Sequence, residues 1–373
     1  MADLFADIVG QRMAVSILKR ALQQGASHAY LFSGPPGVGK SEAAVAFAAG
    51  LACADDGCGE CGTCRRVVEG VHPDVEIVAP EGNLILLEQI TDIGLHAAYR
   101  PYEARAKVYI ILEAESFNAP AANAFLKTLE EPPGHVHFLL VTDRPERLVP
   151  TIVSRCQPVV FSPVPVPVLT AELVSRHGLA EREAALLARV SGGNLAYAQE
   201  LATSASAQRQ RAGLLDLARD LPKLGLWDTE VALDELMATV EARAGERTGE
   251  LETEFTRALE WAADARTKAW LKKRHEDRVK RQQRRLVTGG LQLALRILAG
   301  WYRDLALMAV GAEQGVLNQD RFEELRASAV PGRSLAYTRA VEAADKAQER
   351  LRYNVDARLA IGDMFRSVKE ALS

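Results

Sequence analysis

The fold of this chain follows from one stretch of its sequence, Gly34-Pro35-Pro36-Gly37-Val38-Gly39-Lys40-Ser41. The stretch has the glycine spacing and the Lys-Ser ending of a P-loop. The apolar segment before it, residues 29–33, predicts a buried strand, and the Ala-rich segment after it, residues 42–51, predicts a helix. Because strand, loop and helix occur in the order that a phosphate-binding loop requires, we favour this interpretation over a chance Gly/Pro turn.

Each residue type in this loop has a chemical role in binding phosphate. The glycines let the backbone curl so that successive N–H groups point at phosphate oxygens, and the N-terminus of the following helix adds partial positive charge. Lys40 is expected to reach the β- and γ-phosphates, and the hydroxyl of Ser41 is expected to hold Mg²⁺. The loop therefore predicts binding of ATP or ADP with Mg²⁺, and leaves open whether hydrolysis follows.

Length and composition bound the rest of the chain. Its 373 residues are enough for two or three domains, and a hydrophobic content of 48% is ordinary for a globular protein. No uninterrupted apolar run has membrane-spanning length, and the first residues lack the basic and apolar regions of a secretory signal, so we expect a cytoplasmic protein without membrane contact. The net charge of −4 limits any contact with nucleic acid to a local patch.

Four of the five cysteines are grouped within twelve residues, at Cys53, Cys58, Cys61 and Cys64. Glycines at positions 57, 59 and 62 allow the sharp turns that would aim four sulfurs at one ion. Free cysteines and a redox Cys-x-x-Cys pair are the alternatives, but two overlapping pairs plus a fourth cysteine favour a metal. The spacing predicts one structural Zn²⁺ with no open catalytic position.

Strand and helix patterns alternate through the first 162 residues. Apolar runs predict strands at 74–78, 108–112, 137–141 and 159–161. Helical spacing predicts helices at 13–23, 87–96, 118–129 and 145–153. This alternation indicates an α/β fold with a parallel sheet, helices on both faces, and the phosphate loop at the carboxyl edge.

Several motifs carry a family resemblance. They are Val9-Gly10-Gln11, the P-loop, the four-cysteine insert, the run from Asn123 to Pro133, and Ser154-Arg155-Cys156. Their order and spacing over residues 5–162 resemble the bacterial clamp-loader AAA+ family, which includes the delta-prime and gamma/tau subunits of DNA polymerase III. The segments 301–304 and 354–359 resemble the collar domain of delta-prime more weakly.

This resemblance implies a domain plan and a set of partners. It places a P-loop AAA+ nucleotide-binding domain at 1–162 with the zinc insert at 53–64, a helical lid at 163–207 and an all-helical collar at 208–373. It adds Val9, Gly10 and Gln11 to the nucleotide-binding residues. The implied partners are other clamp-loader subunits, gamma/tau and delta, with the sliding clamp and, through the complex, primer-template DNA.

Two positions favour delta-prime within the family. An active member ends the 108–112 strand with an Asp-Glu pair, whereas this chain has Leu112-Glu113. Active members also carry a lid arginine in Gly-x-Leu-Arg, where this chain has Ala196. The resemblance therefore implies a subunit that helps load the clamp during replication, with weak or absent ATPase of its own.

Arg155 has a separate implied role. In the family, the arginine of Ser-Arg-Cys enters the ATP site of a neighbouring subunit as an arginine finger, for which a planar, always charged guanidinium is suited. The alternative is an ordinary exposed arginine near a helix end. With the surrounding motif, we favour the finger and expect Cys156 to be buried rather than reactive.

The second half of the chain changes character. Residues 163–167 predict an extended proline-rich linker, followed by short helices with a turn at Gly192-Gly193. Longer helices are expected at 209–221, 230–244, 251–270, 286–308, 318–327 and 334–351. Ten basic residues lie between Arg266 and Arg285, where a solvated helix is favoured over a DNA contact. Two other functions remain open, an active gamma/tau-like ATPase and a zinc-ribbon nucleic-acid binder with a vestigial loop.

Overall fold

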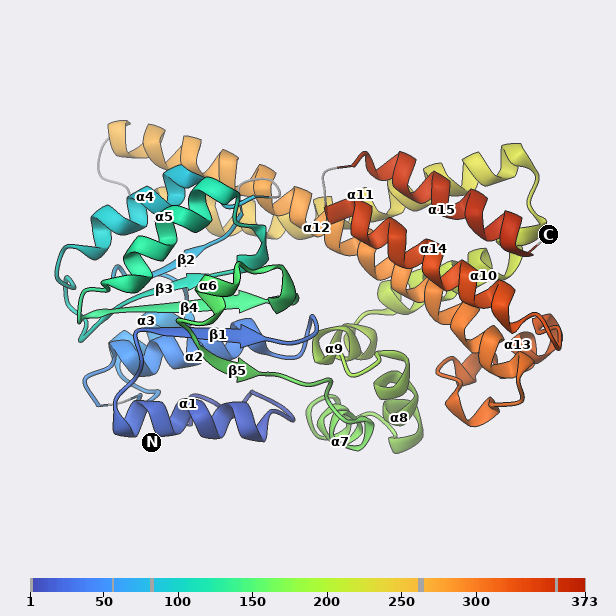
Figure 1. Ribbon diagram of the computed structural model, residues 1–373, viewed down its shortest axis with the longest axis horizontal. Helices are drawn as coiled ribbons and strands as arrows, with labels where there is room; N and C mark the ends of the chain where they lie inside the picture. Colours follow the sequence, from blue (N-terminus) through green and yellow to red (C-terminus); the bar gives the residue numbers. More distant parts are fainter. Residues whose placement is uncertain (1–2, 56, 81–83, 261–264, 353–354, 373) are drawn as a thin grey trace. The chain divides into compact units, whose positions relative to one another are not determined.

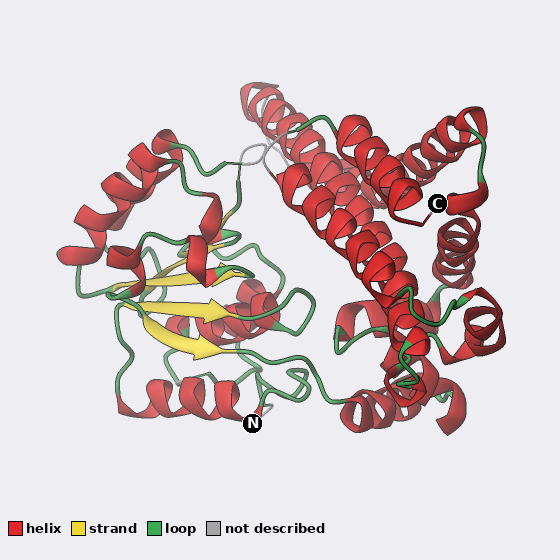
Figure 2. Cartoon of the chain, turned by 45° about the vertical axis from the view of Figure 1, so that its right-hand side comes forward, coloured by secondary structure: helices red, strands yellow, loops and turns green. Residues whose placement is uncertain are grey.

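The computed structural model describes residues 3–55, 57–80, 84–260, 265–352 and 355–372, and the side chains of 247–282 and of 352 lie outside this description. The chain forms two compact units, Met1–Ser204 and Ala205–Ser373. The first unit contains the sheet and the second is helical (Figures 1 and 2). Within the first unit, the predicted boundary at residue 162 stays a prediction.

The sheet of the first unit has five parallel strands, as predicted. They are β1 (Ala29–Ser33), β2 (Val75–Val78), β3 (Lys107–Ile111), β4 (Val136–Thr142) and β5 (Gln157–Val160), in the spatial order β2-β3-β4-β1-β5. The first strand pairs with β4 on one side and with β5 on the other, so the segment that follows β1 leaves the sheet between two neighbouring strand ends.

Helices cover both faces of this sheet, as Figure 1 shows. On one face lie α1 (Arg12–Gln24) and α2 (Lys40–Ala52), and on the other lie α4 (Leu87–Ala97) and α5 (Ala119–Glu130). Successive side chains of a strand point to opposite faces. Tyr30 and Phe32 accordingly belong to one apolar cluster and Leu31 to the other, which explains why every position of β1 is apolar or buried.

Prolines account for two predictions that are wrong in detail. The expected helix at 145–153 is a 3₁₀ turn, η2 (Pro145–Arg147), and one short helix, α6 (Pro150–Val153). Val149 is extended because a residue before proline is excluded from the helical region. The expected linker at 163–167 is extended only to Pro165, since α7 (Val166–His177) accommodates Pro167 in its first turn, where no N–H bond is needed.

The first unit has four further short segments besides α6 and α7. They are α3 (Gly62–Val68), η1 (Ala114–Ser116), and the pair α8 (Glu181–Val190) and α9 (Leu195–Thr203). The predicted turn between the last two helices is confirmed, because Gly192 and Gly193 both have positive φ angles.

The second unit is helical throughout its regular elements, as expected. It contains α10 (Ala205–Asp220), η3 (Leu221–Lys223), α11 (Leu226–Glu260), α12 (Ala265–Ala309), η4 (Glu313–Gly315), η5 (Gln319–Arg321), α13 (Phe322–Ser328), α14 (Ser334–Arg352) and α15 (Ala357–Leu372). The expected break at 245–250 is wrong, because α11 runs through it, whereas the helix favoured over 266–285 is confirmed by the backbone of α12. No proline interrupts either segment, and a glycine inside a helix costs only about 1 kcal/mol. The basic side chains of 266–282 lie outside the described residues.

The buried centre of the second unit lies on α12. Trp301 and Tyr302 are enclosed by the apolar core, and the Tyr302 hydroxyl donates a hydrogen bond to the carbonyl of Ala218 at 2.9 Å. Asp304 is also fully buried, and its carboxylate accepts hydrogen bonds from the backbone N–H groups of Leu317 and Asn318. The 301–304 segment therefore ties α12 both to α10 and to the loop that precedes η5.

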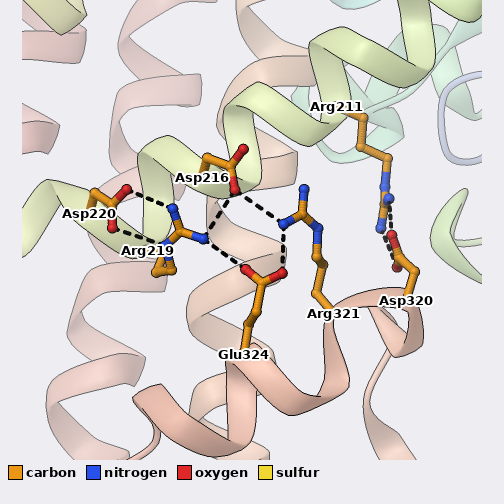
Figure 3. Close-up of polar contacts among 7 residues, drawn as sticks. All are labelled: Arg211, Asp216, Arg219, Asp220, Asp320, Arg321 and Glu324. Carbon is orange, nitrogen blue, oxygen red and sulfur yellow. Dashed lines mark hydrogen bonds and ion pairs between the residues drawn. The ribbon is translucent and has the colours of Figure 1, made fainter.

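An ion-pair network joins α10 to η5 and α13 (Figure 3). Three ion pairs join residues that are far apart in the sequence: Arg211 with Asp320 at 2.6 Å, Arg219 with Glu324 at 2.9 Å, and Arg321 with Asp216 at 3.2 Å. Exposed pairs of this kind contribute little singly, but shared partners hold each other in place. The network therefore fixes η5 and α13, which have few turns of their own, against a long helix.

Candidate functional site

The glycine-rich loop lies at the carboxyl end of β1 and leads directly into α2, as predicted. Gly34, Gly37 and Gly39 have φ angles of 147°, 72° and 94°, a region that side chains disfavour. Space also excludes a side chain, since a Cβ at Gly34 would lie 2.3 Å from the carbonyl oxygen of Phe161. At Gly37 it would lie 2.0 Å from Oδ1 of Asn194. Gly34 and Gly37 are therefore required by both the backbone and its neighbours, and Gly39 by the backbone alone.

Lys40 is the first residue of α2 and is almost fully buried. Its ammonium donates hydrogen bonds to the carbonyl oxygens of Gly34, at 2.8 Å, and Pro35. It also forms an ion pair with Asp143, 2.7 Å from Oδ1. Asp143 directly follows β4, and no sequence motif identified it, because it lies far from Lys40 along the chain. Ser41, in contrast, is exposed in the first turn of α2.

The predicted segment Val9-Gly10-Gln11 lies against the chain that follows β5. The Gln11 side chain is buried, donates to the carbonyl of Ser162 at 2.7 Å and accepts from its N–H at 3.1 Å. A Cβ at Gly10 would meet Val164 at 2.7 Å. Since Gly34 contacts Phe161, the structure brings this segment and the phosphate loop to the same stretch, 161–164.

Leu112 and Ala196, where the resemblance implies catalytic groups in active members, lie at the carboxyl end of β3 and beside the glycine-rich loop. Leu112 follows β3 directly, and its side chain packs against the apolar core formed with α1 and α2. A leucine side chain has no atom that can bind a metal ion. The backbone N–H of Ala196 donates to the carbonyl of Gly37 at 3.3 Å. The position at which the resemblance implies an arginine in active family members is thus in contact with the loop, but its side chain is a methyl group.

A further acidic group, which the sequence did not indicate, lies beside Asp143. Glu115 accepts a hydrogen bond from the hydroxyl of buried Thr142 at 2.6 Å. Burial raises the pKa of Glu115, and the charges of Asp143 and Glu113 raise it further. Glu113 is the one non-glycine residue with positive φ among those described, at 50°. The carboxyl ends of β3 and β4 therefore carry several acidic groups although Leu112 has none.

The four clustered cysteines come together as predicted. Their sulfur atoms all lie within 4.8 Å of one another, with Cys53 3.8 Å from both Cys58 and Cys61, and Cys58 4.0 Å from Cys64. Tetrahedral bonds of about 2.3 Å from one ion to four sulfurs place those sulfurs about 3.8 Å apart. The cluster can therefore hold a metal ion.

Local structure aims these sulfurs. Cys53 is the C-cap of α2, Cys61 is the N-cap of α3, and Cys64 lies in the first turn of α3. Burial opposes ionisation of Cys53, but hydrogen bonds from backbone N–H groups outweigh it and lower its pKa to about 7. Burial and the neighbouring Cys61 and Cys53 side chains instead raise the pKa of Cys64, so a metal would have to displace a proton from that thiol. Cys156 lies apart in the other apolar cluster, where burial raises its pKa to about 12, so the expectation of a buried, unreactive thiol is confirmed.

Arg155 lies after α6, with its side chain 35% exposed. Its guanidinium donates to the carbonyl of Thr151 at 2.9 Å and to the carboxylate of Glu130 at 2.7 Å. Both partners belong to helices α5 and α6 rather than to the phosphate loop. The guanidinium is therefore oriented at the surface of the first unit.

The five-stranded parallel sheet, with a glycine-rich loop between β1 and the N-terminus of α2, defines a P-loop α/β fold. The model of a family described as DNA polymerase III, delta subunit, matches residues 10–165. Subunit delta' of DNA polymerase III from Bacillus subtilis is 29% identical over 333 residues, which cover 88% of this chain and 87% of that protein. Subunit delta' from Pseudomonas aeruginosa is 37% identical, over 53% of this chain and 62% of that protein.

Subunit tau from Escherichia coli is 38% identical over 69% of this chain, but the match spans 41% of tau. Residues 10–165 belong to the family that this model describes, and the chain as a whole is similar to the DNA polymerase III subunits delta' and tau/gamma. Among the described residues, no helix combines the length and the apolar character needed to cross a membrane.

Proposed function

We propose that this chain is the delta-prime subunit of a bacterial DNA polymerase III clamp loader. It assembles in the cytoplasm with gamma/tau and delta subunits, and the complex places a sliding clamp on primer-template DNA. The observation that carries the choice of delta-prime is the combination of a complete phosphate loop with Leu112 at the end of β3, where an active ATPase needs a carboxylate.

The phosphate loop supports nucleotide binding without efficient turnover. The positive φ angles of Gly34, Gly37 and Gly39 and the start of α2 at Lys40 support binding of the phosphate groups of ATP or ADP, and Ser41 is the proposed ligand of Mg²⁺. Activation of water, however, requires a carboxylate pair and is helped by a cation from the lid. Leu112 and Ala196 supply neither group, so hydrolysis by the isolated chain is expected near background.

The four-cysteine cluster fits a structural Zn²⁺. All four ligands are sulfur, which a tetrahedral zinc site accepts, and the set is closed, with no position reserved for a substrate. The ion would join the end of α2 to the start of α3. Its proposed contribution is to the folding of this insert rather than to chemistry.

Arg155 is the proposed contribution of this chain to catalysis. An exposed guanidinium has the charge and planar fork of donors that suit the phosphates of a nucleotide bound by a neighbouring subunit. Its ion pair with Glu130 would be exchanged for phosphate contacts on assembly. The chain would thereby support ATP hydrolysis by others without performing it.

Reconstitution with gamma/tau and delta subunits from the same organism tests this function. We expect the chain to co-elute with them stoichiometrically and to be required for clamp loading on primed DNA, while the isolated chain shows background ATPase. Steady-state hydrolysis by the isolated chain at the rate of an active motor would instead favour the gamma/tau interpretation. Failure to co-elute would remove the clamp-loader assignment.

A further inference from the structure

We propose that Asp143 is a built-in competitor of nucleotide phosphates for Lys40, and that it weakens nucleotide binding by this chain. The inference rests on the proposed phosphate-binding role of the loop. It assigns Asp143, which belongs to none of the sequence motifs, as the residue that determines how readily the loop accepts a nucleotide.

The contacts of Lys40 are the first support. An ammonium has three N–H donors. Within the described residues, these three are directed at the carbonyls of Gly34 and Pro35 and at the carboxylate of Asp143. The lysine side chain is 5% exposed, so water does not compete strongly for the same donors. The negative charge that a phosphate would bring to Lys40 is therefore already supplied by the protein.

The position of Asp143 is built rather than incidental. In the sheet register, Ser33 at the end of β1 pairs with Thr142 at the end of β4, so the segments that follow these strands begin side by side. The Thr142 hydroxyl donates to Glu115 and accepts from the N–H of Arg144 at 2.9 Å. These bonds fix the backbone on both sides of residue 143 and hold its carboxylate at the loop.

The helical segment after β5 adds a second contact to the same loop. The Gly37 carbonyl accepts from Ala196, and the Asn194 side chain fills the space beside Gly37. Asn194 is held there because its Oδ1 also accepts from the N–H of Tyr197 at 2.9 Å. The loop is therefore held by contacts with the start of α9 as well as by those of Lys40.

Electrostatics gives the sign of the effect. For a nucleotide to bind, its phosphate must replace the Asp143 carboxylate as the partner of Lys40. The displaced carboxylate then lies close to phosphate oxygens of the same charge, and this repulsion reduces the binding free energy. Asparagine has the same shape without the charge. Asp143→Asn should therefore keep the fold of the loop and bind nucleotide more tightly, whereas Lys40→Met should remove the gain.

The test is titration calorimetry of the full chain with Mg-ADP and Mg-ATP. We expect Asp143→Asn to bind about tenfold or more tightly than the wild type, because a like charge is removed from the phosphate site. The double variant Lys40→Met/Asp143→Asn should lose that increase. Glu146→Gln, which removes an exposed charge three residues further on, is the matched control and should leave the affinity unchanged.

The outcomes separate this inference from the proposed function. Equal affinity of the wild type and Asp143→Asn, with both dependent on Lys40, would overturn the competition and keep the nucleotide site. No binding by either would overturn both the competition and the nucleotide site, while leaving clamp-loader assembly to its own test. Melting curves without nucleotide check the contact itself: Asp143→Asn should lower the melting temperature only when Lys40 is present.

Discussion

Arg155 has a defined conformation in the free chain, and a function in trans requires that it change partners. The bond to Glu130 orients the guanidinium at the surface, where both side chains are partly exposed. Surface ion pairs contribute little to stability, so the cost of releasing Arg155 is small. The ion pair with Glu130 therefore orients the Arg155 side chain at the surface of the free chain and opposes assembly only weakly.

Arg155→Ala should leave folding, metal content and assembly intact, since an exposed side chain changes stability by about 0.5 kcal/mol or less. At the neighbouring ATP site, turnover should fall on the order of 10³-fold. Arg155→Lys should rescue poorly because an ammonium lacks the planar fork. The measurement is DNA-stimulated ATPase and clamp loading by the reconstituted complex.

Arg182→Ala, at an exposed arginine of α8, is the matched control and should behave as wild type. Because several ATP sites contribute, the loss in total hydrolysis can be partial while clamp loading falls further. Equal activity of wild type and Arg155→Ala, with assembly verified, would show that Arg155 is an ordinary surface residue.

The charge of the Asp74 carboxylate contributes to the stability of the first unit. Burial opposes its ionisation, but its carboxylate accepts three backbone hydrogen bonds, from Glu103, Tyr102 and Ala104, and these lower its pKa. The bonds hold the 102–104 loop against the start of β2. A group with a lowered folded-state pKa stabilises the protein above its unfolded pKa, and that contribution is lost as the pH falls through the folded value.

We expect Asp74→Asn to reduce the free energy of unfolding of the first unit by about 2 kcal/mol at pH 7, because hydrogen bonds to a charged acceptor are lost. The difference from wild type should shrink below about pH 4, where the unfolded chain binds the proton. Urea unfolding between pH 3 and 7 measures it. A difference that is constant across this range would mean that shape rather than charge matters at this position.

At the scale of elements, α3 depends on its neighbours for its existence. It has seven residues, far fewer than a helix needs to be stable alone, and its N-cap is Cys61. The contacts that organise it include the sulfur cluster, Val67, which is buried in the core beside α2, and the ion pair of Arg66 with Glu103. Metal binding and formation of α3 should therefore be one event.

Elemental analysis should find about one zinc per chain, and Cys61→Ser or a strong chelator should remove it and lower the melting temperature of the first unit. The sheet should persist, because its apolar clusters draw few residues from the insert. Cys156→Ala, outside the cluster, should retain the metal. Well under one zinc per chain, together with unchanged stability of Cys61→Ser, would contradict the site.

At the scale of the whole molecule, the apolar clusters divide the chain in two. Two clusters draw all their residues from the first unit, and the third draws all of its residues from the second. A chain with separate cores does not have to unfold in a single transition. Stability is therefore a property of each unit and not one number for the protein.

Calorimetry should resolve more than one transition. Trp301→Ala should reduce the free energy of unfolding of the second unit, and Phe47→Ala that of the first, by about 3 to 5 kcal/mol each, because both side chains are fully buried. The melting temperature of the affected unit should fall accordingly. Secondary-structure signals assign the transitions, since all strands of the described residues lie in the first unit. A single transition that both substitutions shift equally would mean that the two units unfold together.

Some of this architecture is encoded locally and could be predicted from the sequence. The path from β1 through the loop to α2 is one, because an apolar run, three glycines and an Ala-rich segment follow each other within 24 residues. The cysteine cluster is another, since short loops bring its ligands together whatever the rest of the chain does. Predictions were wrong where local signals compete, as at Pro150 and along α11, where a weak break is overridden.

Only the tertiary structure decided which residues far apart in the chain contact each other. Gln11 bonds to Ser162 across 151 residues, Lys40 pairs with Asp143, and Arg155 pairs with Glu130. Each pairing depends on the order of the strands in the sheet, and that order is set by packing between segments far apart in the chain. Local sequence therefore determined that this protein has a phosphate loop, while the sheet placed a carboxylate beside its lysine.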